Sequence, residues 1–334
     1  MSAVDVDLLL VGAGPVGLYG AYYAGVRGLR TAVIDSLPEP GGQITALYPE
    51  KPIYDVAGFR SVKGRDLVGG LLDQAAQYEP AYLLGIAATT LARGVDGRWR
   101  VGTDGGPTVR CRAVVLTGGI GTFTPRPLPA GEEFVGRGLA YFVPSLDDCA
   151  ERDVVIVGGG DSACDWALAL AGIARSVTVV HRRQAFRAHA GTVAAMLASR
   201  ANVLVEAQVS KVLGADVIDS VEVLIKGKES NLLLPCQRLV AALGFLADLG
   251  PVRDWGVALQ DNRHVLVDSR MRTSVAGIYA AGDIADYDGK VRLISVGFGE
   301  VATAVNNAAV ELDPNAQLFP GHSTDAAPAP AVIA

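Results

Sequence analysis

The sequence has few of the residues that build metal centres or thiol relays. Its four cysteines, Cys111, Cys149, Cys164 and Cys236, lie far apart without a CxxC pair, and only four histidines are present. No group of His and Cys residues has the spacing of metal ligands. We therefore expect reduced, mostly buried thiols and no metal site.

Long hydrophobic runs and an excess of basic residues are also missing. No apolar run reaches the roughly 18 residues that a membrane-spanning helix needs. The N-terminus lacks the basic region that opens a signal peptide. The net charge is −6, which argues against nucleic acid as a partner. These absences favour a cytoplasmic protein that binds neither membrane nor nucleic acid.

The pattern of an apolar strand, a glycine turn and a helix occurs twice in the chain. It first covers residues 7–28, and it restarts at residue 153 as DVVIVGGGDSACDWALALAG. In such a turn the first glycine permits a tight bend, the second lets the backbone approach a pyrophosphate, and a small third residue lets the helix pack on the strand. The repeat predicts an α/β fold with two Rossmann-like, three-layer dinucleotide-binding domains. The turn residues are Gly12, Gly14 and Gly17 in the first copy and Gly158, Gly160 and Ala163 in the second.

The two copies differ in charge where the second strand ends. At this position, 23 residues after the first glycine of its turn, the first copy has an acid and the second has a histidine followed by two arginines. A carboxylate accepts hydrogen bonds from a ribose 2′-hydroxyl, whereas guanidinium groups bind a 2′-phosphate. We therefore expect FAD in the first domain and NADPH in the second. The residues are Asp35 in the first copy and His181, Arg182, Arg183 and, further on, Arg187 in the second.

The rest of the chain shows a coarser pattern of elements. Apolar runs predict strands over residues 6–11 and 31–34, and a helix follows over about 64–78. Between them, residues 36–61 read as a long loop whose Tyr, Ile, Val and Phe residues predict packing. After residue 244 we expect a strand, a polar turn and a long Ala-rich helix. The Ala- and Pro-rich tail, residues 326–334, is expected to be disordered.

Several spaced motifs together resemble the flavoproteins with two dinucleotide-binding domains, in their thioredoxin-reductase-like branch. The motifs are VGAGPVGL, GGQ, VIVGGGDSA, HRRQAFR and IYAAGDIA. The resemblance implies an FAD domain from residues 1–117 and 245–325, with an NADPH domain, residues 118–244, inserted between them. The CxxC of thioredoxin reductases would fall on Tyr141 and Pro144, neither of which is a thiol. Electrons are then expected to leave directly from the flavin.

A group without this dithiol fits better, namely the ferredoxin–NADP⁺ reductases of thioredoxin-reductase type. The segments GGQITALYPEKPIYDVAGF, GGGDSACDWA and FPGHSTDA are similar to that group. By this resemblance Tyr48 stacks on one face of the flavin, and His322 covers the opposite face from the partner subunit of a homodimer. The residues implied to line FAD are Asp35, Gln43, Tyr48, Ala88, Phe123, Asp283 and Thr324.

The expected reaction is hydride exchange between NADPH and FAD, with one-electron transfer to ferredoxin and no catalytic side chain beyond the flavin. Lys51, Arg60, Lys63 and Arg65 are candidate contacts for an acidic ferredoxin, although acids lie among them. One alternative is an NADPH-dependent flavin reductase of flavodoxin, a quinone or a small disulfide. Another alternative, from a different class, is a non-catalytic redox-sensing flavoprotein.

Overall fold

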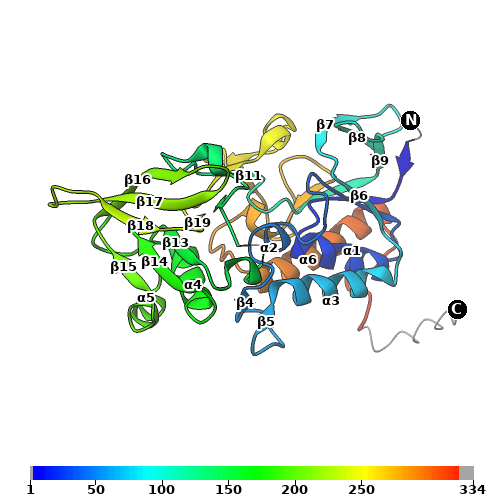
Figure 1. Ribbon diagram of the computed structural model, residues 1–334. Helices are drawn as coiled ribbons and strands as arrows, with labels where there is room; N and C mark the ends of the chain where they lie inside the picture. The colour runs from blue at the N-terminus through cyan, green and yellow to red at the C-terminus, as the bar shows by residue number, and fades with distance from the viewer. Residues whose placement is uncertain (1–2, 144, 323–334) are drawn as a thin grey trace, which may run out of the picture. The chain divides into compact units, whose positions relative to one another are not determined.

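Two parallel β-sheets organise the chain in the computed structural model, which describes residues 3–143 and 145–322 (Figure 1). The chain divides into two compact units. The first contains the N-terminal residues to Ala46, Lys51–Thr122 and the residues from Asp248 onward, and the second contains Leu47–Glu50 and Phe123–Ala247. Among the described residues, no helix is both long and apolar enough to cross a membrane.

The first unit is built around a five-stranded parallel sheet. Its strand β2 (Leu8–Val11) is apolar throughout, because both faces of this sheet are covered. Leu8 and Leu10 pack on one side of the sheet, and Leu9 packs on the other. The order is β23 (Ile278–Ala280), β10 (Ala113–Leu116), β2, β3 (Thr31–Asp35) and β6 (Ala81–Leu84), and all neighbouring strands are parallel.

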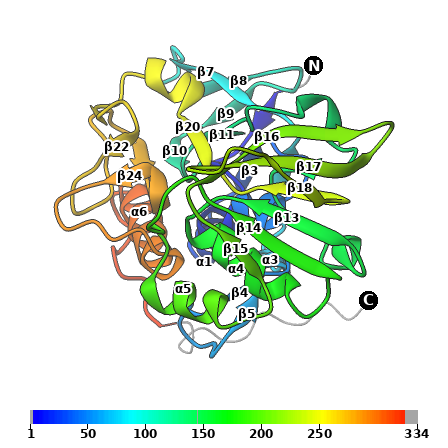
Figure 2. The ribbon, with the colours of Figure 1, turned by 60° about the vertical axis from the view of Figure 1, so that its left-hand side comes forward.

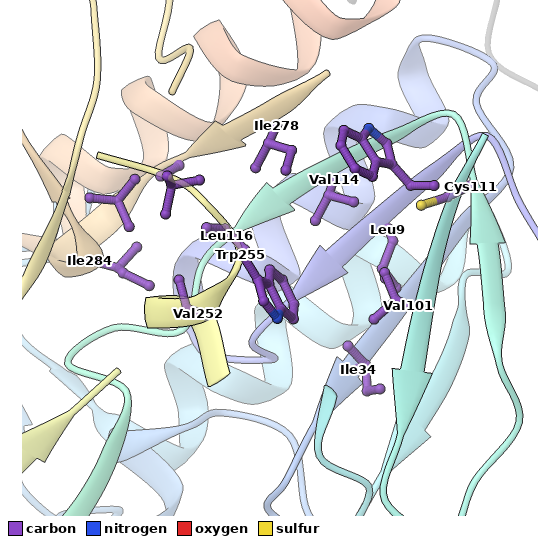
Figure 3. Close-up of a cluster of buried hydrophobic side chains, with 14 of the residues drawn as sticks. Leu9, Ile34, Val101, Cys111, Val114, Leu116, Val252, Trp255, Ile278 and Ile284 are labelled. Atoms are coloured by element: carbon purple, nitrogen blue, oxygen red, sulfur yellow. The ribbon is translucent and has the colours of Figure 1, made fainter. Parts of the chain in front are cut away.

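Helices cover one face of this sheet, and a second sheet with a buried core covers the other. Helix α1 (Pro15–Val26) packs between α3 (Gly64–Ala76) and α6 (Ile294–Leu312). On the opposite face, Figure 3 shows Trp255 and Val252 gathered with Leu116 beside the central strands. The covering sheet has the order β1 (Val4–Asp5), β9 (Val109–Cys111), β8 (Trp99–Thr103) and β7 (Ala88–Arg93).

The second unit repeats the same three layers. Helices α4 (Asp161–Leu170) and α5 (Ala190–Leu197) cover one face of its parallel sheet. Three antiparallel strands cover the other face, and Figure 2 shows them beside β13 and β14. The parallel sheet has the order β12 (Leu139–Ala140), β19 (Arg238–Ala241), β13 (Asp153–Val157), β14 (Ser176–Val180) and β15 (Asn202–Leu204), and the covering strands are β16 (Ala207–Gly214), β17 (Ile218–Ile225) and β18 (Leu232–Pro235).

Shorter elements complete the two units. Strands β11 (Thr122–Pro125) and β20 (Phe245–Asp248) pair with each other where the chain passes from one unit to the other. The remaining elements are α2 (Gln43–Leu47), β4 (Pro52–Ile53), β5 (Val62–Lys63), β21 (Leu259–Gln260), β22 (His264–Leu266), β24 (Ala285–Asp286) and the 3₁₀ turns η1 (Glu132–Phe134), η2 (Asp147–Cys149), η3 (Gly250–Asp254) and η4 (Gly282–Ile284).

The predicted strands and helix are present as β2, β3 and α3. The segment 36–61 is not wholly a loop, since it contains the short helix α2 and the strand β4. After residue 244 the predicted strand, polar turn and Ala-rich helix are β23, η4 and α6. The tail over residues 326–334, for which disorder was expected, lies outside the described residues.

Candidate functional site

The first glycine turn joins β2 to α1, and its three glycines have different steric surroundings. Gly12 has φ +119°, and a Cβ there would lie 2.5 Å from the Thr117 carbonyl oxygen. A Cβ at Gly17 would overlap the carbonyl oxygen of Gly12, so the helix can approach the turn only without a side chain. At Gly14, by contrast, no atom lies within 4 Å of the Cβ position. The open side of the turn, at a helix start without a side-chain cap, fits a pyrophosphate.

Asp35 ends β3 beside this turn and is tied to it. Its Oδ2 accepts a hydrogen bond of 2.6 Å from the Ala13 N–H, and its Oδ1 accepts one of 2.9 Å from the Leu37 N–H. Burial raises the pKa of the Asp35 carboxyl, and the two N–H groups oppose that rise. Each carboxylate oxygen keeps a lone pair, so the group can still accept a hydroxyl of a ribose.

The Gly-Gly-Gln segment at the start of α2 lies against the same turn. The Gly41 N–H donates to the Ala13 carbonyl oxygen at 2.8 Å. A Cβ at Gly42 would lie 3.0 Å from the Gly14 Cα. Gln43 follows directly, and its Nε2 lies 3.0 Å from the Cβ position of Gly119. The structure thus brings Gln43 to the glycine turn, as a shared site requires.

The 3₁₀ turn η4 brings Asp283 to the start of α1. A Cβ at Gly282 would lie 3.2 Å from Val16 Cγ2, and a Cβ at Gly297 in α6 would lie 2.5 Å from the same atom. The carbonyl oxygen of Asp283 lies 3.0 Å from His264 Nδ1. The first unit therefore collects Gly12, Gly14, Gly17, Asp35, Gln43 and Asp283 around one helix start.

All of the contacts expected with FAD stay predictions, those of the remaining candidate residues included. Ala88 is half-buried at the start of β7, and Phe123 lies in β11. Tyr48 belongs to the short segment grouped with the second unit, and its ring packs against the helix-side hydrophobic cluster there. His322 is exposed, and its ring meets that of Phe319 edge-on at 5.1 Å. Thr324 lies outside the described residues.

The second glycine turn, between β13 and α4, has the same layout as the first, with a crowded first glycine and an open second one. A Cβ at Gly158 would overlap the carbonyl oxygen of Ala242, and nothing lies within 4 Å of the Cβ position of Gly160. Ala163, in the first turn of α4, is fully buried. Gly160 precedes α4 and makes no side-chain cap. A second pyrophosphate fits here for the same physical reason.

His181, at the end of β14, is a packing residue in this structure. Its side chain is buried, its Nε2 lies 3.1 Å from the Ala185 carbonyl oxygen, and its ring stacks on Phe186 at 4.8 Å. A Cβ at Gly159 would overlap the His181 ring. The ring therefore shapes the turn after β14 and holds it against the glycine turn.

Three arginines project from the turn that His181 shapes. Arg182, Arg183 and Arg187 are exposed, and the Arg187 N–H donates to the Gly159 carbonyl oxygen at 2.8 Å. Within residues 3–143 and 145–322, none of their guanidinium groups makes a hydrogen bond or ion pair. Their positive charge stands where the first unit has the Asp35 carboxylate. This edge can bind a dianionic phosphate.

The cysteines form no redox pair within the described residues. All four are buried and unpaired, as the sequence suggested. Burial raises the pKa of Cys111 and Cys236 to about 12 and that of Cys164 to about 11. These thiols stay protonated at neutral pH and are poor nucleophiles. Of the two positions that correspond to a CxxC, Tyr141 is partly buried and Pro144 lies outside the described residues.

Two units with the same layers, each with a glycine turn at a helix start, define a class of enzymes that bind two dinucleotides. Comparison with known proteins agrees. The family model described as "Pyridine nucleotide-disulphide oxidoreductase" matches residues 6–308, and the chain belongs to this family. That family and the names of the relatives below imply a flavin and NADP.

The relatives include ferredoxin–NADP reductases over nearly the whole chain. The proteins of that name from Nocardioides sp. and Salinispora tropica are both 59% identical to it, over 97% and 96% of this chain and 98% and 99% of theirs. The one from Thermus thermophilus is 44% identical over 98% of this chain and 99% of its own.

Solved structures agree on the fold. Thioredoxin reductases of T. acidophilum and Lactococcus lactis superpose with TM-scores of 0.77 and 0.76, each at 24% identity. They cover 92% of this chain and 98% and 99% of their own. The resemblance to ferredoxin–NADP⁺ reductases of thioredoxin-reductase type is confirmed, and so is the predicted fold class.

Proposed function

We propose that this chain is a FAD-dependent ferredoxin–NADP⁺ reductase, in which NADPH reduces FAD and ferredoxin takes the electrons one at a time. One observation carries the proposal. Two glycine turns of the same layout, each open at its second glycine, are followed by opposite charge, a carboxylate at Asp35 and guanidinium groups at Arg182 and Arg183. The full-length relatives named ferredoxin–NADP reductase support the choice of acceptor.

We assign FAD to the first unit, as residues 1–117 and 245–325, and NADPH to the inserted segment 118–244. In the FAD site the turn at Gly14 would hold the pyrophosphate, Asp35 the adenosine ribose, and Asp283 the ribityl side. In the NADPH site Gly160 would face the pyrophosphate and the three arginines the 2′-phosphate. When bound, FAD supplies both hydride acceptance and one-electron release. The chain's own residues bind and orient the two nucleotides.

The cysteines support direct electron transfer from the flavin. A disulfide relay needs two thiols close enough to bridge and at least one thiolate. The four buried thiols supply neither. We therefore propose an acceptor that takes electrons without a thiol intermediate, which favours ferredoxin over thioredoxin.

Ferredoxin, with flavodoxin as a second acceptor, is proposed to dock on the β4–β5 hairpin of the first unit. The aromatic rings of Tyr54 and Phe59 are 71% and 52% exposed there. Arg60 and Lys63 are exposed beside them. We also propose a homodimer in which His322 covers the partner's flavin, and a cytoplasmic location, which the unpaired cysteines support.

A panel of acceptors tests the function. The purified protein should carry FAD, and turnover should be fastest with ferredoxin under NADPH when ferredoxin, flavodoxin, a quinone and thioredoxin are each assayed under NADPH and NADH. Rapid thioredoxin reduction, or equal use of both pyridine nucleotides, would contradict the proposal. A redox sensor that cannot receive hydride would keep its oxidised flavin spectrum after anaerobic addition of NADPH.

A further inference from the structure

A buried ion pair lies under the FAD site that we propose. Only 3% of the Lys290 side chain and 5% of the Glu300 side chain are exposed. The neighbours of Glu300 in α6, such as Val301 and Ala304, are fully buried and apolar. Charged groups are costly to bury unless they are paired and hydrogen-bonded. The fold therefore needs a specific reason to place them here.

The Glu300 carboxylate collects donors from three different places. Its Oε2 accepts the Gly282 N–H at 2.8 Å and Lys290 Nζ at 2.6 Å. Its Oε1 accepts the Tyr287 hydroxyl at 2.6 Å. That hydrogen bond, together with burial, raises the pKa of Tyr287 to about 12, so the phenol stays a donor at neutral pH. Lys290 and Tyr287 thus hold the Glu300 carboxylate in place, and this carboxylate in turn holds the backbone N–H of Gly282.

That amide begins the turn that presents Asp283. Gly282 has φ +81°, a left-handed conformation that glycine adopts without steric cost. Val16 packs against Gly282 from the first turn of α1, and His264 lies at the Asp283 carbonyl oxygen. Among the described residues, Glu300 is the one side chain that accepts the Gly282 N–H. Without it, this buried donor would have no partner.

We propose that Glu300 is a positioning residue of the FAD site, which acts through the Gly282 N–H to hold Asp283 at the flavin's ribityl–pyrophosphate region. The inference rests on the proposed function, because that function assigns Asp283 to FAD. We assign Glu300 no direct contact with either nucleotide, since its carboxylate is occupied by Gly282, Tyr287 and Lys290. A turn that is already held in its bound conformation loses less conformational entropy when FAD binds. Loss of the Glu300 contact should therefore weaken FAD affinity.

Two nearly isosteric variants isolate the Gly282 contact. Both carry Tyr287→Phe and Lys290→Met, which remove the other two donors, and one adds Glu300→Gln while the other adds Glu300→Met. Position 300 is then neutral in both, and only Gln can accept the Gly282 N–H. The apoproteins are titrated with FAD by flavin fluorescence, their Tm values are measured by circular dichroism, and amide exchange is followed at Gly282.

The Gln variant should bind FAD about as tightly as the wild type, and the Met variant about tenfold or more weakly at a similar apoprotein Tm. Amide exchange at Gly282 should be faster in the Met variant. Equal FAD affinity in the two variants would overturn this inference alone. So would a Met variant that fails to fold beside a folded Gln variant, because Glu300 would then serve stability. A wild-type apoprotein without FAD affinity would overturn the proposed function as well.

Discussion

Asp35 and His181 occupy the same position in their units and use their side chains in opposite ways. The Asp35 carboxylate reaches the glycine turn through the Ala13 N–H and keeps lone pairs for a ribose. The His181 ring packs against Gly159 and Phe186 instead. The sequence predicted His181 as a nucleotide contact, and that stays a prediction. Strand-end spacing alone could not show that its ring packs within the protein. In the second unit, we therefore propose that the arginines decide the choice of nucleotide.

We expect Arg182→Ala combined with Arg183→Ala to raise KM for NADPH by about a hundredfold or more and to leave KM for NADH nearly unchanged. Each guanidinium should contribute about 1.5–3 kcal/mol through charge-assisted bonds to the 2′-phosphate. Steady-state kinetics with both nucleotides measure the effect. Arg200→Ala, at another exposed arginine of the same unit, is the matched control. An equal rise in KM for NADH would mean that the arginines bind both nucleotides alike and do not recognise the 2′-phosphate.

At the scale of elements, the repeated strand, turn and helix were predictable because each has a strong local signal. Apolar strands buried on both faces and small residues at fixed spacing leave few other folds. Helix α2 was missed since it has only five residues, within a segment rich in Gly and Pro. Glu300 was missed because an acid in a helix is usually solvated. Its partners Tyr287 and Lys290 meet it only after the chain folds.

The glycine turn predicts opposite outcomes for two substitutions in one motif. Gly14→Ala should leave the Tm of the apoprotein nearly unchanged, because its Cβ meets open space, and should weaken FAD binding where the pyrophosphate approaches. Gly17→Ala should destabilise the first unit by about 1–3 kcal/mol or more, because its Cβ overlaps a carbonyl oxygen. Thermal unfolding and FAD titration of both apoproteins separate the two effects.

The matched substitution in the second unit is Gly160→Ala, which also meets open space. It should raise KM for NADPH and leave FAD affinity intact. If Gly14→Ala and Gly160→Ala each weakened both nucleotides equally, the assignment of one nucleotide to each turn would be wrong.

At the scale of the whole molecule, two units with their own cores explain how one chain can serve two nucleotides. The sequence predicted both sheets because their strands are continuous apolar runs. It did not resolve the antiparallel strands on the far faces, such as β16–β18. Their residues alternate between buried and exposed positions, and Leu224 and Leu233 remain exposed. Such strands are defined by partners that lie far away in the chain.

The β4–β5 hairpin offers a test of partner recognition at this scale. Arg60→Glu with Lys63→Glu should raise KM for ferredoxin on the order of tenfold at low ionic strength and weaken its salt dependence, since charges steer association. Activity with a small quinone should stay unchanged. Lys228→Glu, at an exposed lysine of the second unit, is the matched control. An unchanged KM for ferredoxin would place the docking face elsewhere.

The pairing of β11 with β20 has a consequence for how such enzymes diversify. Apart from the short segment Leu47–Glu50, the chain leaves the first unit and returns to it along two strands that pair with each other, so the long intervening segment begins and ends at neighbouring strands. A gene rearrangement that exchanged this segment would leave every strand of the first parallel sheet uncut. Under the proposed assignment of the nucleotides, such an exchange would change the electron donor and leave the flavin site intact.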